Sequence, residues 1–187
     1  DIDLLAPMAG KNLVRVMLSI ATLDPETARR LEPRAATPQR RLATIARLTE
    51  AGIPTGVIVA PIIPALTDHD IERVLRAARD AGATLASYVF LRLPLEVRDL
   101  FVEWLEAHYP DRAAHVMSLV RQSRGGADND AGFGRRMAGT GLFADMVAQR
   151  FWVAARRLGF EGRGDQPLDC SKFHRPDAGP RQMDLFS

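Results

Sequence analysis

Apolar residues follow two different patterns along the chain, and the change falls near residue 94. Before it, three short runs rich in β-branched and apolar residues alternate with segments of helical spacing. The runs cover 13–20, 55–60 and 85–91, and each suits a strand that is buried on both faces. Strands that alternate with helices in this way need right-handed crossovers, so the pattern predicts an α/β fold with a parallel sheet.

Residues that begin and end helices support this division. Asp24 and Thr37 each precede a proline, an arrangement that places a capping side chain before the first helical residue. Gly52 follows the second of these helices, where a left-handed residue commonly ends one. Thr67 and Asp70 stand three residues apart before the next helical segment, and this spacing predicts a capping box.

Beyond residue 94 the strand pattern stops. Apolar residues recur there at helical spacing, and between the last two such segments lies a glycine-rich, polar stretch. After Gly162 the chain is rich in Gly, Pro, Asp and Arg, a composition typical of flexible segments. The sequence therefore predicts an α/β part over 1–94, a helical extension over 95–160 and a flexible tail over 161–187.

Composition narrows the class of protein. Apolar residues make up 47% of the chain, enough for a substantial core, and the net charge of +2 is too small to indicate nucleic-acid binding by itself. No stretch approaches the roughly 20 apolar residues that a membrane helix needs, and no secretion signal is recognisable. These features predict a cytoplasmic protein that makes no membrane contact.

A single cysteine limits the metal chemistry. Because Cys170 is alone in the sequence, one chain can form neither an internal disulfide nor an all-cysteine zinc or iron–sulfur site. The four histidines show no ligand spacing. We therefore expect this chain by itself to be free of metal.

The carboxyl ends of the predicted strands are the places where a parallel barrel would build its site. These places are Ser19–Thr22 after the first strand, Ala60–Ile63 after the second and Arg92–Pro94 after the third. Ser19 could bond a ligand or only neighbouring backbone, and 61–63 could form an apolar wall for a planar ring or simply pack in the core.

Several of these residues form a longer pattern. The run SIATLDPETARRLEPRAATPQRRLATIARLTEAGIPTGVIVAPIIP, at 19–64, resembles the second half of the radical S-adenosylmethionine barrel. It is most similar to spore photoproduct lyase-like proteins, also known as DNA repair photolyases. The matching features are Ser19-Ile20, Glu32-Pro33, Arg41, Ala51-Gly52 and Ala60-Pro61-Ile62. The run 91–126, LRLPLEVRDLFVEWLEAHYPDRAAHVMSLVRQSRGG, resembles one bacterial subgroup of these proteins.

The resemblance implies the C-terminal half of a partial (β/α) barrel, followed by a helical extension. It implies that the full-length enzyme cleaves S-adenosylmethionine reductively at a [4Fe–4S] cluster and abstracts a hydrogen atom with the resulting radical. Action on damaged DNA, and so contact with DNA, belongs to the same expectation. The family's CxxxCxxC motif is absent, so we expect a cluster-binding part, with the strand that would pair beside 13–20, to precede Asp1, and the chain alone to be inactive.

The resemblance also implies cofactor contacts. Ser19 matches a polar residue that reaches the ribose or the methionine carboxylate, and Arg41 and Arg34 could pair with that carboxylate. Ile62 and Arg92 would lie beside the adenine. For both Arg41 and Arg34 the alternative is a solvated side chain or a surface ion pair.

Two other readings stay open. The last residues include Gln182, Met183, Leu185 and Phe186, and this QMDLF run resembles the peptide by which bacterial repair proteins bind the sliding clamp, so the chain could be a non-catalytic interaction module. A half-barrel of an unrelated phosphate-binding enzyme is the other, but Arg92-Leu93-Pro94 replaces the glycine-rich loop it would need.

The glycine-rich stretch allows two interpretations. Arg124, Arg135 and Arg136 lie among its glycines and could follow a phosphate backbone. The stretch could equally be a flexible interhelical loop, since no GK[ST] follows and Phe133 is the one aromatic residue in it.

Overall fold

Three parallel strands form the centre of the protein in a computed structural model that describes residues 1–133, 135–161 and 167–174. The strand order is β1-β2-β3, with Val16 opposite Thr55 and Gly56 opposite Leu85. The elements in chain order are α1 (Ile2–Ala9), β1 (Val16–Ser19), α2 (Pro25–Leu31), α3 (Pro38–Glu50), β2 (Thr55–Ile62), the 3-10 turn η1 (Asp68–Asp70), α4 (Ile71–Asp80), β3 (Leu85–Phe90), α5 (Val97–His108), α6 (Pro110–Gln122) and α7 (Leu142–Arg157).

The predicted α/β class and the parallel sheet are confirmed, and closure of a barrel stays a prediction. All three predicted strands exist, although β1 is shorter than its apolar run and β2 continues through Pro61 to Ile62. Helix α1 was not predicted. Its residues are mostly apolar, but none of them is buried.

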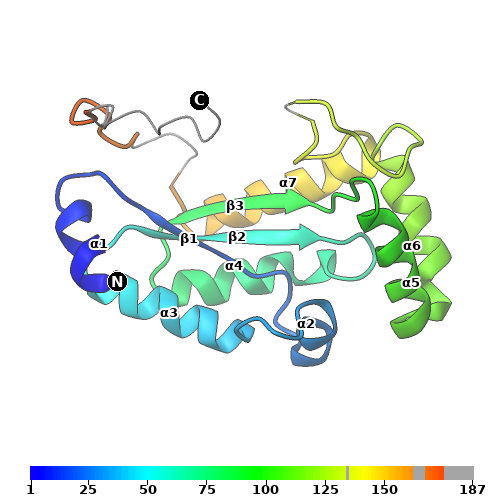
Figure 1. The fold of residues 1–187 in the computed structure, drawn as a ribbon, viewed down its shortest axis with the longest axis horizontal. Coiled ribbons are helices and arrows are strands. Elements are labelled where there is room, and N and C mark those ends of the chain that lie inside the picture. Colours follow the sequence, from blue (N-terminus) through cyan, green and yellow to red (C-terminus); the bar gives the residue numbers. More distant parts are fainter. Residues whose placement is uncertain (134, 162–166, 175–187) are drawn as a thin grey trace, which may run out of the picture.

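One face of the sheet carries the main core. Side chains that alternate along the strands, such as Val57, Val59 and Ala86, pack with residues of α4 and α7. Figure 1 shows α4 and α7 behind the sheet, and no described helix in front of it. Ile58 and Ser87 point to that opposite face and are only partly buried. The sheet is therefore covered by described helices on one side.

Helix α7 belongs to this core. Val147 and Phe151 are fully buried in it together with strand residues, and Phe160 just after the helix completes it. The chain then returns beside the start of β3, where the Glu161 amide donates to the Thr84 carbonyl at 2.9 Å. The predicted domain limits stay a prediction, but α7 packs with the sheet rather than with the two helices that precede it.

Helices α5 and α6 form a smaller core beyond the carboxyl ends of the strands (Figure 1). Leu105 and Val116 from these helices pack against Ile63 and Leu93, which follow β2 and β3. The helical pair is therefore seated on the loops where a parallel sheet usually builds its site.

The helix-capping predictions have different outcomes. The Asp24 carboxylate accepts a hydrogen bond from the Thr27 amide at 2.7 Å, Thr37 caps α3, and Gly52 has a left-handed φ of 73°, all as predicted. The capping box at Thr67 and Asp70 is wrong. The Thr67 hydroxyl instead accepts from the Ile63 amide and donates to the Pro61 carbonyl, because the turn after β2 leaves these groups unpaired.

In the described part of the chain, no helix has both the length and the apolar content required to cross a bilayer.

Candidate functional site

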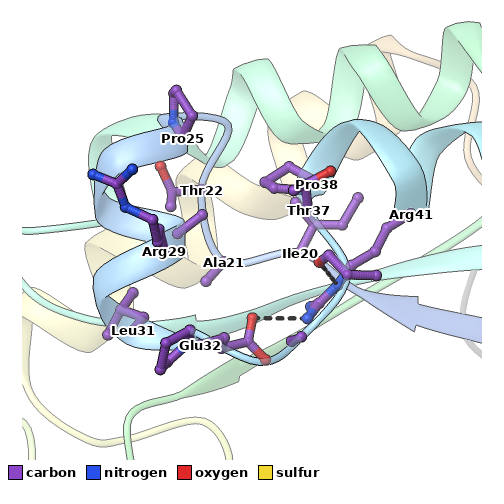
Figure 2. Close-up of a pocket in the computed structure, with 14 residues that line it drawn as sticks. Ile20, Ala21, Thr22, Pro25, Arg29, Leu31, Glu32, Thr37, Pro38 and Arg41 are labelled. Carbon is purple, nitrogen blue, oxygen red and sulfur yellow. Dashed lines mark hydrogen bonds and ion pairs between the residues drawn. The ribbon is translucent and has the colours of Figure 1, made fainter.

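A pocket of about 340 Å³ opens at the carboxyl end of β1 (Figure 2). Its walls come from the turn at residues 20–22, from α2, and from the loop that leads through Glu32 to the first turn of α3. The walls are mainly apolar, with a few polar groups, as in most small-molecule sites. This is the strand end at which the sequence predicted Ser19 and Arg41.

Arg41 ties the surrounding segments together. Its Nη1 donates to the Ser19 carbonyl at 2.7 Å and to the Ser19 hydroxyl at 3.2 Å, and its Nε donates to the Ala36 carbonyl at 3.0 Å. Its Nη2 lies 3.0 Å from a carboxylate oxygen of Glu32. Figure 2 shows this ion pair at the edge of the pocket. The guanidinium therefore joins the end of β1 to the start of α3.

The ion pair decides what Arg41 can offer a ligand. Of its five N–H donors, three are occupied by backbone and Ser19, and one by Glu32. The Arg41 side chain is 13% exposed and that of Glu32 is 40% exposed, so Glu32 is the more accessible partner. An incoming carboxylate can gain a two-pronged contact with Arg41 only if Glu32 moves away.

Asp70 holds the turn after β1 from the other side. Its carboxylate is fully buried and accepts hydrogen bonds from the Thr22 hydroxyl and, at 3.1 Å, from the Leu23 amide. Burial acts to raise the pKa of Asp70, but the bonds from Thr22 and Leu23, with the nearby Arg73 guanidinium, outweigh it and the pKa is lowered. Asp70 is thus held as a carboxylate, and it fixes the turn that lines the pocket.

Helix α2 is anchored to the helical pair behind it. The Trp104 indole donates to the Arg30 carbonyl at 3.0 Å, and the hydroxyls of Thr27 and Tyr109 lie 3.0 Å apart. The Arg30 guanidinium also covers the Tyr109 ring at 5.2 Å. The position of one pocket wall therefore depends on α5 and on Tyr109, which begins α6.

The structure brings Ser19 and Arg41 together but leaves Arg34 apart. Ser19 is exposed and bonded to Arg41, which is a contact with a neighbour rather than with a ligand. Arg34 is exposed and does not line the pocket. The cofactor roles of all three residues stay predictions.

The two residues predicted beside the adenine lie elsewhere. Ile62 is 0% exposed and packs in the core on the helix-covered face of the sheet, so its side chain has no free surface to offer. Arg92 follows β3 and is half-buried, and it does not line the pocket after β1. An adenine contact by Ile62 would require this part of the core to open.

The cluster implied by the resemblance does not fit this chain. The sequence has one cysteine, Cys170, and it is exposed in the segment after α7. Among the residues that the structure describes, no three His, Cys, Asp or Glu side chains gather as a metal site. The thiolates of a [4Fe–4S] cluster would have to come from other residues.

Sequence reasoning pointed to Thr22 only as part of the strand-end range 19–22, and it missed Asp70 and Arg29 as residues of the site. Arg29 lines the pocket from α2, and nothing in its surroundings in the sequence separates it from other helix-surface arginines. Asp70 stands 48 residues from Thr22, so no local signal could join the two. Glu32 did stand in the family pattern, but only the structure shows that it pairs with Arg41.

The predicted clamp-binding residues, Gln182, Met183, Leu185 and Phe186, lie outside the described residues.

Residues 1–78 match the model of the Radical SAM superfamily. The matched range contains β1, α2, α3, β2 and most of α4, and therefore every residue that lines the pocket. The match supports the radical SAM superfamily for this part of the chain, and through the family it implies S-adenosylmethionine and a [4Fe–4S] cluster in full-length proteins.

Uncharacterized relatives were also found. Proteins of Mycobacterium tuberculosis and Mycobacterium bovis are each 36% identical over 124 residues, which is 65% of this chain and 36% of the relative. A protein of the Acidianus two-tailed virus is 35% identical over 112 residues, or 57% of this chain and 35% of the relative. The chain thus spans about a third of the length of these curated relatives. No solved structure gives a significant match.

Proposed function

We propose that this chain is the C-terminal part of a radical S-adenosylmethionine enzyme and that the pocket after β1 supplies part of its cofactor site. The observation that carries the proposal is that residues 1–78, which match the Radical SAM superfamily, include the whole pocket lining. The pocket also lies at the carboxyl end of a parallel strand, where sites of such folds are built.

Arg41 is the residue that would recognise the cofactor. A methionine carboxylate that displaces Glu32 would face the free edge of the Arg41 guanidinium, a charge-assisted pairing of the kind that arginine favours. The Ser19 hydroxyl, which accepts from Nη1 of the same guanidinium, would bond the carboxylate or the ribose. The mainly apolar walls would exclude water from the thioether chain.

A second part of the enzyme would have to complete the reaction. The cluster supplies the electron that cleaves the cofactor, and this chain, with one cysteine, cannot hold it. The partly buried face of the sheet at Ile58 and Ser87 would be the inner face of the barrel. This polypeptide alone would show neither a reconstituted cluster nor cleavage of S-adenosylmethionine, and formation of a cluster on it would refute that statement.

Calorimetric titration of S-adenosylmethionine into the chain tests the site. We expect saturable binding that the Arg41→Ala variant weakens about tenfold, because a charge-assisted hydrogen bond is lost. Arg40→Ala is the matched control, since Arg40 is the exposed preceding residue on α3 and does not line the pocket. Equal affinity in the wild type, Arg41→Ala and Arg40→Ala would contradict the proposed site.

Membership of the spore photoproduct lyase-like group, with action on damaged DNA, is the finer form of this proposal. It rests on the resemblance of runs 19–64 and 91–126. A full-length protein that carries this chain should then convert ultraviolet-induced thymine photoproducts in DNA when S-adenosylmethionine and a reductant are present. Cofactor cleavage without change in the photoproducts would reject the DNA-repair assignment and keep the radical enzyme.

A sliding-clamp contact is proposed separately for the QMDLF run. Leu185 and Phe186 would fill an apolar pocket of the clamp, and Gln182 would provide a polar anchor. Capture of a purified bacterial clamp by the chain should be lost in the Leu185→Ala, Phe186→Ala double variant. Capture that is unchanged by the two substitutions would remove this proposal.

A further inference from the structure

A second arginine at a strand end is more deeply buried than Arg41. Arg124 follows α6, is 4% exposed, and donates to the Leu91 carbonyl at 2.5 Å and weakly to the Arg135 carbonyl at 3.4 Å. Its guanidinium also lies over the Phe90 ring at 5.5 Å. Its Nε is buried and has no hydrogen-bond partner among the described residues. Every partner of this cation is thus an uncharged group.

The charge of Arg124 is not balanced nearby. No carboxylate of the described part lies within ion-pair distance of it, and a second arginine, Arg92, acts on it by repulsion. Burial first, and Arg92 in addition, lower the pKa of Arg124, against an opposing influence of Asp130. The Nε of Arg92 is likewise buried without a partner. Burial of an uncompensated cation is costly, so this place favours the arrival of an anion.

Asp130 compensates the charge of Arg124 only in part, from beyond ion-pair distance. One of its carboxylate oxygens accepts from the Gly132 amide at 2.7 Å and the other lies 3.5 Å from the Arg135 Nε. Among the residues that line the cavity described below, Arg124 and Arg135 carry two positive charges against the one negative charge of Asp130. The lining therefore keeps a net positive charge.

A cavity of about 340 Å³ opens at these groups. Arg124, Asp130 and Arg135 line it together with Asn129, whose buried carboxamide oxygen has no partner in the described part, and Thr140. Gly125 has a positive φ of 66°, and a side chain added to it would meet nothing within 4 Å. The cavity is therefore lined by cationic and polar groups and remains open to solvent on its glycine side.

We propose that this cavity binds a phosphate group, with Arg124 at its base and Arg135 at its rim. The proposal does not rest on the proposed cofactor site, because the two pockets share no residue. Arginine donors suit the tetrahedral oxyanion of a phosphate, and the net positive charge of the lining attracts an anion. The phosphate can belong to a small phosphorylated molecule or to a nucleic-acid backbone.

Calorimetric titration of inorganic phosphate at constant ionic strength tests the site. Two variants are expected to change the phosphate affinity in opposite directions. Arg135→Gln removes a cation from the rim and should weaken binding about tenfold. Asp130→Asn removes the opposing charge but keeps an oxygen for the Gly132 amide, and should tighten binding about fivefold. A residue pair with a merely structural role would not shift affinity in opposite directions.

Controls keep the result interpretable if a variant folds poorly. Arg157→Gln, at an exposed position of α7, changes net charge by the same amount as Arg135→Gln and should leave phosphate affinity unchanged. Absence of saturable phosphate binding by the wild type, or equal affinity in Arg135→Gln, Asp130→Asn and Arg157→Gln, would overturn the proposal.

Two further probes identify the source of the phosphate. If a short single-stranded oligonucleotide binds, and the variants rank by affinity as they do for inorganic phosphate, the site takes a nucleic-acid phosphate. If inorganic phosphate and a nucleoside monophosphate bind but the oligonucleotide does not, it takes a small phosphorylated molecule.

Discussion

Arg41 and Arg124 occupy similar places but differ in how their charge is balanced. Each donates to a backbone carbonyl at the carboxyl end of a strand, Arg41 to Ser19 after β1 and Arg124 to Leu91 after β3. Arg41 has a carboxylate partner in Glu32, whereas Arg124 has none within ion-pair distance in the described part. At one strand end the arginine is paired with a carboxylate and joins two segments. At the other strand end it is a cation without an ion-pair partner among the described residues.

The difference shows that a neighbouring carboxylate decides whether a buried arginine is already paired or can accept an anionic ligand. At the β1 end, Glu32 and Asp70 both lie close to the turn, so local charge is balanced before any ligand arrives. At the β3 end, Asp130 is engaged by Arg135 and Gly132, and positive charge remains. The first site must exchange a partner to bind an anion, and the second only has to accept one.

The largest effect is expected from removal of the carboxylate that pins the β1 end. Asp70→Ala leaves the Thr22 hydroxyl and the Leu23 amide without their acceptor, and should lower the free energy of unfolding by about 3 kcal/mol. Urea unfolding measures this change. Asp80→Ala, at the exposed end of the following helix α4, is the control and should stay within about 0.5 kcal/mol of the wild type. Equal stability of both variants would show that the β1 end needs no carboxylate.

Acid should loosen the β1 end through the same group. The folded pKa of Asp70 lies below its unfolded value, so its ionisation adds stability that is fully present above the unfolded pKa. That stability is lost as the pH falls through the folded pKa. Asp70→Asn should therefore unfold with a shallower dependence on pH in the acid range. An unchanged acid profile would mean that Asp70 is not held as the carboxylate.

Replacement of the uncompensated cation should cost less. Arg124→Met removes the donor of the Leu91 carbonyl but also removes a buried charge, and we expect a loss of about 1 to 2 kcal/mol in urea unfolding. Added phosphate should stabilise the wild type and not this variant. If phosphate stabilised Arg124→Met as much as the wild type, Arg124 would not be the cation that binds phosphate.

The smallest change in stability is expected where Arg41 loses its carboxylate partner, which leaves it without an ion pair, as Arg124 is in the described part of the chain. Glu32→Gln removes the partner of Arg41, and because that pair is partly exposed the free energy of unfolding should fall by less than about 1 kcal/mol. The affinity for S-adenosylmethionine should rise, since its carboxylate no longer has to displace Glu32. Glu50→Gln, exposed at the end of α3, is the control. A lower affinity in Glu32→Gln would show that Glu32 takes part in binding.

Most of the fold could be predicted from periodicity and helix-end residues. The three strands and the helices after Asp24 and Thr37 follow from local signals that tertiary packing reinforces. Helix α1 was missed, and Pro7 inside it is a residue that usually argues against a helix. The capping box failed because Thr67 and Asp70 are each used by distant backbone and side-chain groups, and local spacing cannot anticipate such competition.

The candidate site could be predicted only in part. Ser19 and Arg41 were found through their position at a strand end and on a helix start, and the structure joins them. Ile62 was placed correctly at a strand end, but the face to which its side chain points depends on the irregular register between Val59 and Ile62. The partners of Arg41 and Asp70 depend on contacts between separate segments, which no single-sequence pattern encodes.

The burial of α7 ties the sheet to residues that lie beyond the family match. The family match ends at residue 78, yet Val74 and Val59 are sealed from water partly by Val147 and Phe151. A protein truncated at residue 78 would lack α7, and the apolar residues that α7 covers would be exposed. We expect such a truncated protein to aggregate. Fusion, truncation and domain-swap experiments should therefore keep the polypeptide intact through Phe160.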